Sequence, residues 1–201
     1  MILLVHGWGF DATLWDGVRA ALPPDVAVEA VDLGFFGAPT TLPDRVDLAV
    51  GHSLGALFLL TERPDMAARL VLVNGFPRFT AAPDFPLGVA PRVVERMARR
   101  LKDAPAEVVD AFRDRCGAGP AGGVPDLAQL AWGLDLLHHG DGRAALPGRS
   151  FSVIAGTADP IVPPAMTEAA FGAGVRWLDG GHLLPLTHPQ EVAAAIMEAR
   201  P

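Results

Sequence analysis

The feature that most constrains this chain is a serine held between two glycines, in the run GHSLG at residues 51–55. A short, mainly apolar run at residues 47–50 precedes it, and a second apolar run at residues 56–60 follows. This order predicts a buried strand, a turn too tight for bulky neighbours, and a helix. Such a turn presents the Ser53 hydroxyl above the end of a sheet as a candidate nucleophile. The alternative is a glycine-rich turn in which Ser53 only caps the helix.

Short apolar runs alternate with helical patterns along most of the chain, which is typical of βαβ units and a parallel sheet. We expect strands at residues 1–5, 28–33, 47–50, 69–73, 151–155 and 175–178. We expect the helices that alternate with them at residues 11–22, 53–62, 164–171 and 189–199. The sequence therefore predicts an α/β fold with a parallel sheet of about six strands.

The alternation stops after residue 75. Residues 76–145 carry no strand pattern and predict helices at 91–101, 106–115 and 127–137. We therefore divide the chain into an α/β core, residues 1–75 and 146–201, and a helical insertion, residues 76–145. We expect the insertion to cover the strand ends as a lid, and a separate inserted domain is the alternative.

Ser53 needs a base and an orienting acid, because a free hydroxyl is a weak nucleophile. Asp159 follows one expected strand and His182 follows the last, so both fall in loops at the carboxyl ends of parallel strands. Serine, acid, histidine is one of the chain orders in which catalytic triads occur. We expect His182 to take the Ser53 proton and Asp159 to hold the other ring nitrogen. Asp32 and Asp179 are the alternative acids.

An oxyanion formed by attack of Ser53 needs two N–H donors. The Leu54 N–H begins the helix behind Ser53, and the Trp8 N–H lies in the loop HGWG at residues 6–9. We expect these two groups to form the oxyanion hole and the Trp8 indole to line a pocket, with core packing as the alternative role of the indole. The remaining histidines are expected to be structural or exposed. His52 stands beside the serine and should point away from it, and the others are His6, His138, His139 and His188.

Composition excludes several classes of function. The formal net charge of −7 argues against nucleic acid as a partner, and no apolar run is long enough to span a membrane. The apolar start lacks the basic residues of a signal peptide, and the single Cys116 suits a reducing cytoplasm. There is no phosphate-binding loop and no metal-spaced Cys/His cluster, so we expect neither cofactor nor metal. We expect a cytoplasmic monomer.

Four motifs together resemble the α/β-hydrolase superfamily: HGWG, GHSLG, TADPIVP at residues 157–163 and GGHLLPLTHP at residues 180–189. Within it, the chain is similar to the pimeloyl-acyl-carrier-protein methyl ester carboxylesterases of biotin synthesis, through Trp8, GLDLL at residues 133–137 and FPRF at residues 76–79. The resemblance implies ester hydrolysis through an acyl-enzyme on Ser53. It also implies substrate contacts from Trp8, Ser53, Leu54, His182 and a stretch of the insertion made of Phe112, Arg113, Asp114, Arg115 and Cys116.

The chain departs from that family in places. It begins at the strand before HGWG, so we expect the usual N-terminal hairpin to be missing, and DLGFFG at residues 32–37 replaces the common DLPGHG. The family binds an acidic acyl carrier protein through arginines of the insertion. Here the helix with Glu107 and Ala111 offers arginines only later, and the candidates are Arg96, Arg99, Arg100, Arg113 and Arg115.

The predicted substrate is a methyl or other small-alcohol ester of a medium-chain acyl group, free or bound to acyl carrier protein. Four phenylalanines are expected to line an acyl channel or, alternatively, to form the core of the insertion: Phe76, Phe79, Phe85 and Phe112. The triad alone does not set the reaction. The alternatives are a general short-chain carboxylesterase without a carrier partner, a carbon–carbon hydrolase or lyase of the same fold, and a non-catalytic hydrolase-like binding protein.

Overall fold

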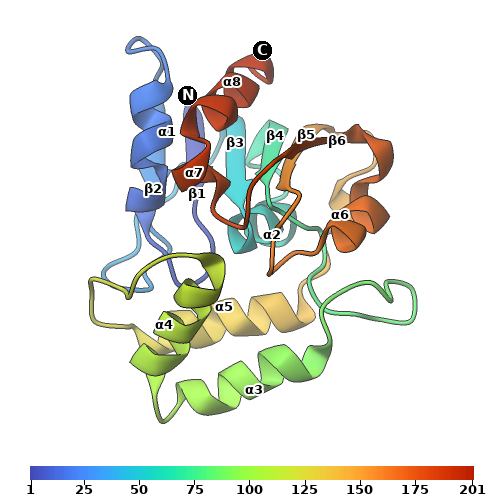
Figure 1. Ribbon diagram of the computed structural model, residues 1–201. Coiled ribbons are helices and arrows are strands. Elements are labelled where there is room, and N and C mark those ends of the chain that lie inside the picture. Colours follow the sequence, from blue (N-terminus) through green and yellow to red (C-terminus); the bar gives the residue numbers. More distant parts are fainter.

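A computed structural model describes residues 1–201 and contains one sheet with helices packed around it (Figure 1). The six strands are β1 (Ile2–Val5), β2 (Val28–Val31), β3 (Val46–His52), β4 (Ala67–Val73), β5 (Ser150–Gly156) and β6 (Val175–Leu178). Their order is β2-β1-β3-β4-β5-β6 and every neighbouring pair is parallel. The predicted α/β fold with a six-stranded parallel sheet is confirmed, and all carboxyl ends of the strands lie along one edge.

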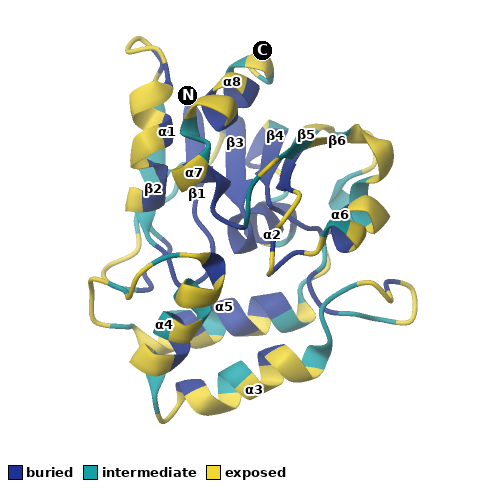
Figure 2. Ribbon diagram, viewed as in Figure 1, coloured by how far each residue is buried: buried dark blue, intermediate teal, exposed yellow.

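The central strands are the most deeply buried part of the molecule (Figure 2). All four residues of β1 are buried, as are the last four of β4, because helices cover both faces of a parallel sheet. In the register, Leu4 lies beside Val50 and Val50 beside Val71, so branched apolar side chains stack across strands. This dry sheet is the fixed base on which the loops at its carboxyl edge are built.

The core helices are α1 (Asp16–Ala21), α2 (Leu54–Thr61), α6 (Pro164–Phe171), α7 (Leu184–Thr187) and α8 (Pro189–Glu198). Asp11 accepts a hydrogen bond from the Thr13 N–H and thereby caps a 3₁₀ turn, Ala12–Trp15, that leads into α1. The helix predicted over residues 11–22 is therefore two shorter pieces. Helix α7 was not predicted; it begins two residues after His182. No helix is both long and apolar enough to cross a membrane.

The helical insertion runs between β4 and β5 and contains α3 (Pro91–Leu101), α4 (Pro105–Cys116) and α5 (Leu127–His139). Proline starts both α3 and α4, where its missing N–H costs no helical hydrogen bond. Helix α4 ends at Gly117, whose positive φ of 91° is the usual stop of a helix. The three helices lie beyond the carboxyl edge of the sheet, with α3 outermost (Figure 1).

The two ends of the insertion are tied to each other. The Gly142 N–H donates to the Pro77 carbonyl over 2.7 Å, and Arg78 forms an ion pair of 2.8 Å with Asp141. Arg143 binds the same Asp141 carboxylate at 2.6 Å and Asp84 at 2.7 Å. Hydrogen bonds from Arg143 and then Arg78 hold the pKa of Asp141 well below its usual range. We call Arg78, Asp84, Asp141 and Arg143 the hinge cluster.

Candidate active site

Ser53 follows β3 directly and stands in a backbone conformation that side chains rarely adopt, with φ 53° and ψ −119°. Its flanking glycines make the turn possible. A Cβ on Gly51 would lie 2.5 Å from the Ala56 nitrogen, and one on Gly55 would lie 2.3 Å from the Val5 carbonyl oxygen. The strained backbone of Ser53 is therefore part of a tight turn that needs glycine on both sides. This turn raises the serine above the edge of the sheet.

The structure brings together the three side chains that the sequence pattern singled out. The Ser53 hydroxyl lies 3.0 Å from His182 Nε2, and His182 Nδ1 lies 2.8 Å from Asp159 Oδ2. The three residues come from loops after β3, β6 and β5, and each is at most 5% exposed. In this arrangement the imidazole accepts the hydroxyl proton on one nitrogen and donates from the other, which is the hydrogen-bond chain of an activated serine.

Asp159 is held as an anion by a complete set of donors. Its Oδ1 accepts the N–H groups of Ile161 (2.8 Å) and Val162 (2.9 Å), and its Oδ2 accepts from His182 and from Asn74 Nδ2 (2.7 Å). Burial by itself raises the pKa of this carboxyl, but the charge and hydrogen bond of His182 and those two N–H groups outweigh it and lower the pKa. The acid thus stays ionised opposite the imidazole at neutral pH.

The rival titratable groups are engaged elsewhere. Burial, reinforced by the charge of His182, lowers the pKa of His52 to about 3, so its ring is neutral; its Nε2 lies 2.8 Å from the His182 carbonyl oxygen. His6 Nε2 accepts the Leu33 N–H, and Asp32 lies 3.7 Å from that ring. Asp179 is exposed. Neither alternative acid bonds to His182.

The loop HGWG packs against the turn that carries Ser53. A Cβ on Gly7 would lie 3.0 Å from the Ser53 Cβ, so the backbone of this loop passes beside the serine. Helix α2 begins at Leu54, and the first N–H groups of a helix have no partner inside it. Trp8 is 1% exposed and its indole N–H donates to the Leu130 carbonyl of α5 at 2.9 Å. Its ring therefore both packs in the core and lines the cavity described next.

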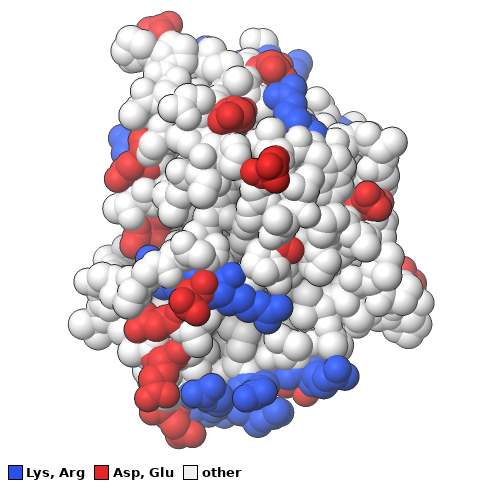
Figure 3. All heavy atoms as spheres, viewed as in Figure 1, with Lys and Arg blue, Asp and Glu red and all other residues white.

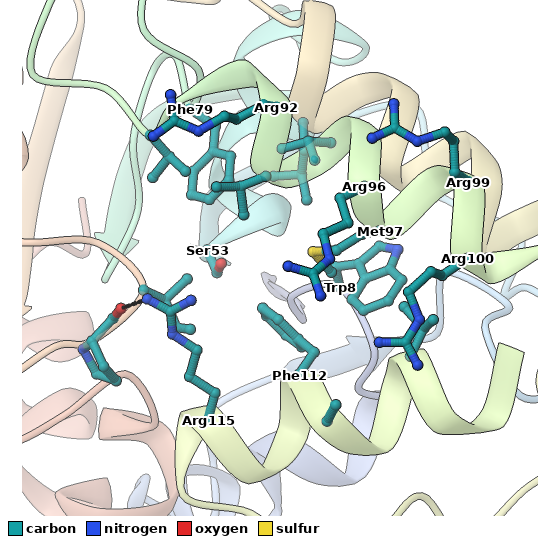
Figure 4. Close-up of a pocket in the computed structure, with 18 of the residues that line it drawn as sticks. Trp8, Ser53, Phe79, Arg92, Arg96, Met97, Arg99, Arg100, Phe112 and Arg115 are labelled. Atoms are coloured by element: carbon teal, nitrogen blue, oxygen red, sulfur yellow. Dashed lines mark hydrogen bonds between the residues drawn. The ribbon is translucent and has the colours of Figure 1, made fainter. Parts of the chain in front are cut away.

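A cavity of about 600 Å³ lies between this edge of the sheet and the insertion, and Ser53 is among its lining residues (Figure 4). Most of its wall is apolar, including Phe79 and Phe112, whereas Phe76 and Phe85 do not line it and are buried nearby. The remaining apolar lining comes from Trp8, Val89, Val93, Val94, Met97, Val108, Ala111, Leu137, Pro160, Ile161 and Pro163. Five arginines complete the wall: Arg92, Arg96, Arg99, Arg100 and Arg115.

The stretch 112–116 of α4 divides between the cavity and its surroundings. Phe112 packs edge-on against Trp8 with ring centroids 5.1 Å apart, and Arg115 lines the cavity while donating to the Pro160 carbonyl at 3.0 Å. The other three residues do not line it. Arg113 donates to the carbonyl oxygens of Gly9 (2.9 Å) and Gly119 (2.8 Å) and covers the Phe10 ring, while Asp114 is exposed and Cys116 is buried.

Cys116 offers no second nucleophile. Burial, together with the charge of Asp159, raises the pKa of its thiol to about 12, so it is protonated at neutral pH. No group of three or more His, Cys, Asp or Glu side chains is arranged to hold a metal ion.

Helix α3 carries exposed cations beside the cavity. Four arginines of this helix line the cavity: Arg92, Arg96, Arg99 and Arg100 (Figure 4). A blue band of basic side chains lies over α3 in Figure 3. We call the four arginines the α3 arginine face. Two of them have carboxylate partners, Arg99 with Glu95 at 3.9 Å and Arg100 with Glu107 at 3.5 Å. These pairs are exposed and therefore hold their arginines only weakly.

Sequence reasoning missed Asn74. It follows β4 directly, is 1% exposed, and its amide reaches Asp159 and the Gly181 carbonyl. The available signal was its position, because it is a polar residue placed directly after four buried apolar residues of β4 and before Gly75.

Comparisons with known proteins show the family of the chain. A sequence model described as "Alpha/beta hydrolase family" matches residues 2–195. The chain is 30% identical to the pimeloyl-[acyl-carrier protein] methyl ester esterase of Neisseria meningitidis serogroup C over 83% of this chain and 78% of that protein. It is 29% identical to the protein of the same name from Aromatoleum aromaticum over 97% and 96%.

Solved structures show the same fold. The bromoperoxidase of Bacillus anthracis superimposes with a TM-score of 0.77 at 18% identity, over 98% of this chain and 90% of that one. The esterase EaEST of Exiguobacterium antarcticum gives a TM-score of 0.77 at 16% identity, over 98% and 90%. At such identities the match describes the arrangement of strands and helices alone.

Proposed function

The chain belongs to the α/β hydrolase family and is a carboxylic ester hydrolase, and we propose that it cleaves its ester through an acyl-enzyme formed on Ser53. The observation that carries this proposal is the buried hydrogen-bond chain from Ser53 through His182 to Asp159, opening on an apolar cavity. A hydroxyl, a neutral imidazole and a carboxylate at these distances are the groups that nucleophilic acyl transfer needs.

The reaction proceeds in two halves. His182 Nε2 takes the proton as the Ser53 oxygen attacks the ester carbonyl carbon, and the N–H groups of Leu54 and Trp8 bind the oxyanion. The tetrahedral intermediate expels the alcohol, which leaves with that proton, and an acyl-enzyme remains. Water, deprotonated by His182, then attacks the acyl carbon and releases the acid and free Ser53. Asp159 stabilises the imidazolium in both halves.

The cavity supports a medium-chain acyl group. Its wall beside Ser53 is made of apolar side chains such as Phe79, Met97 and Phe112, which desolvate an alkyl chain. The helical insertion supplies most of that wall and acts as a lid over the strand ends. Relatives named methyl ester esterases support a methyl or other small alcohol as the leaving group.

The α3 arginine face supports a substrate carried by an acidic protein. Its four arginines and Arg115 surround the cavity of a chain whose formal net charge is −7. Relatives are named for an acyl-carrier-protein ester. We therefore assign the protein to hydrolysis of a pimeloyl-[acyl-carrier protein] methyl ester in biotin synthesis, acting as a cytoplasmic monomer.

A panel of acyl esters, each offered free and bound to acyl carrier protein, tests this assignment through kcat/KM. We expect the carrier-bound methyl ester to exceed the free methyl ester of the same chain, and a fluorophosphonate to label Ser53. The ratio kcat/KM should rise with pH along one limb and then level, because the neutral imidazole is the base. Absence of labelling would instead support a non-catalytic binding protein.

A general short-chain carboxylesterase without a carrier partner is the second candidate. One observation favours it: the guanidinium of Arg113, a candidate for carrier binding, is occupied by the Gly9 and Gly119 carbonyls. Equal kcat/KM for free and carrier-bound esters would support this candidate over the first.

A further inference from the structure

Asn74 connects the two loops that carry Asp159 and His182. It stands at the end of β4, between β3, which leads to Ser53, and β5, which leads to Asp159. Its side-chain amide donates to Asp159 Oδ2 at 2.7 Å and to the Gly181 carbonyl, next to His182, at 3.3 Å. One buried group thus fixes the distance between the acid loop and the histidine loop.

The amide binds the carboxylate oxygen that faces the imidazole. Two backbone N–H groups occupy Asp159 Oδ1, while Oδ2 receives His182 Nδ1 and Asn74 Nδ2. A carboxylate has about four acceptor positions on its two oxygens. Without Asn74, Oδ2 would be held by the imidazole alone, and one of the four hydrogen bonds that oppose rotation about the carboxylate axis would be lost.

The backbone at this position is shaped for the same contact. Asn74 has a positive φ of 47°, in the left-handed region where asparagine is one of the few side chains tolerated. Its own N–H donates to the Ile154 carbonyl of β5 at 2.8 Å, which fixes the residue against the next strand. Its Oδ1 is buried without a hydrogen-bond partner. Such a group lowers stability, so packing alone does not explain an asparagine here.

We propose that Asn74 is a positioning residue for the triad acid, which fixes Asp159 Oδ2 in line with His182 and joins the loops of the two residues. This inference rests on the proposed function, since it assigns Asn74 a role only through Asp159. Asn74 does not line the cavity, so it acts on the rate of the chemical step and leaves substrate binding unchanged.

Asn74→Gly is the main test, because glycine keeps the left-handed backbone without strain and removes only the amide. We expect kcat to fall roughly 10- to 100-fold, the usual consequence of losing a hydrogen bond to a charged group, with KM little changed. Thr80→Val is the matched control. It also removes a side-chain hydrogen bond of a buried residue, from Thr80 to the His138 carbonyl at 2.8 Å, but Thr80 bonds to neither Asp159 nor His182. It should retain wild-type kcat.

Asn74→Asp supplies a readout that a structural role would not change. Two carboxyl groups within hydrogen-bond distance share one proton, and the protonated partner still donates to Asp159. At higher pH that proton is lost and two like charges face each other. The plateau of kcat/KM should therefore become a descending limb. A profile that superimposes on that of the wild type would overturn the proposal, even if Asn74→Gly failed to fold.

The pairing with Asp159 is tested by combining variants. In an Asp159→Ala background, Asn74→Gly should cost less than about twofold more in kcat with an activated ester, because the acceptor is already gone. A further loss as large as in the wild-type background would overturn the proposal.

The two hypotheses fail in different ways. If Ser53→Ala remained active, the proposed function would fail. If Ser53→Ala were inactive while both Asn74 variants matched the wild type in kcat and in pH profile, only the positioning role would fail.

Discussion

The carboxyl edge of the sheet and the α3 arginine face border one cavity but are built in opposite ways. At the sheet edge, Ser53, Asp159 and His182 are at most 5% exposed and each is held by hydrogen bonds within 3.0 Å. On α3 the arginines extend into solvent, and the two ion pairs are 3.9 Å and 3.5 Å long. The contrast teaches that this chain keeps the buried, tightly bonded residues that cleave the ester apart from the exposed, weakly held arginines that attract an acidic partner.

The largest effect should follow from removing the nucleophile. Ser53→Ala should lower kcat by on the order of 10⁴-fold or more for every ester, because the triad acts as a unit. His182→Ala should cost about as much and Asp159→Asn somewhat less. Rates on p-nitrophenyl butyrate, with thermal unfolding as the control for folding, provide the measurement. Activity of Ser53→Ala within tenfold of the wild type would contradict the assignment of ester cleavage to the carboxyl edge of the sheet.

Charge reversal on α3 should raise KM for a carrier-bound ester and leave the chemical step intact. In the double variant Arg92→Glu/Arg96→Glu, KM for a carrier-bound ester should rise by about tenfold or more at low salt, since opposite surface charges steer association. Arg92 and Arg96 have no ion-pair partner, so the change breaks no internal pair. Hydrolysis of p-nitrophenyl butyrate should change far less.

The control for that variant is Arg45→Glu/Arg63→Glu, two exposed arginines outside the cavity that give the same change in net charge. The effect on α3 should shrink between 0.01 M and 0.15 M salt, as the Debye length falls from about 30 Å to about 8 Å. If both double variants, or both substrates, responded alike to salt, docking of a carrier on this face would be refuted.

Arg113 should be an exception to this comparison, because it belongs to the insertion yet donates to the Gly9 carbonyl of the loop HGWG. Arg113→Met removes the hydrogen bond to the Gly9 carbonyl and should lower kcat about tenfold for free and carrier-bound esters alike. Arg99→Met, which removes one charge from the same insertion, should affect only the carrier-bound ester. Equal behaviour of the two variants would place Arg113 with the steering arginines.

The smallest effect should come from the hinge cluster. Arg143→Met should lower Tm at pH 7 by at most about 4 °C, because its ion pairs are partly exposed and therefore contribute little. Since the pairing holds the pKa of Asp141 below its unfolded value, its stabilisation is present above about pH 4 and is lost as the pH falls further. The difference in Tm from the wild type should therefore shrink as the pH falls below about 4, and it should vanish only below the lowered pKa of Asp141. Arg176→Met, at the exposed pair with Glu198, is the control.

The sequence predicted the sheet and the meeting of the triad side chains because both depend on local patterns. Buried parallel strands are short apolar runs, and residues following such strands must share one edge. It did not predict Asn74, because its partners Asp159 and Gly181 are 85 and 107 residues away and no spacing rule links them. It also grouped Arg113 with the free arginines, since nothing in a sequence reports that a guanidinium reaches the Gly9 carbonyl.

The hydrogen bond between Gly142 and Pro77 places the two ends of the insertion side by side. A chain segment whose ends adjoin can be exchanged for another of different length without moving the strands that flank it. The insertion is therefore a natural unit for building chimeras, in which a core from one relative receives the whole segment from another. Selectivity and bond-cleaving power can then diverge separately during evolution wherever a new insertion keeps the bond of Arg113 to the Gly9 carbonyl and the bond of Trp8 to the Leu130 carbonyl.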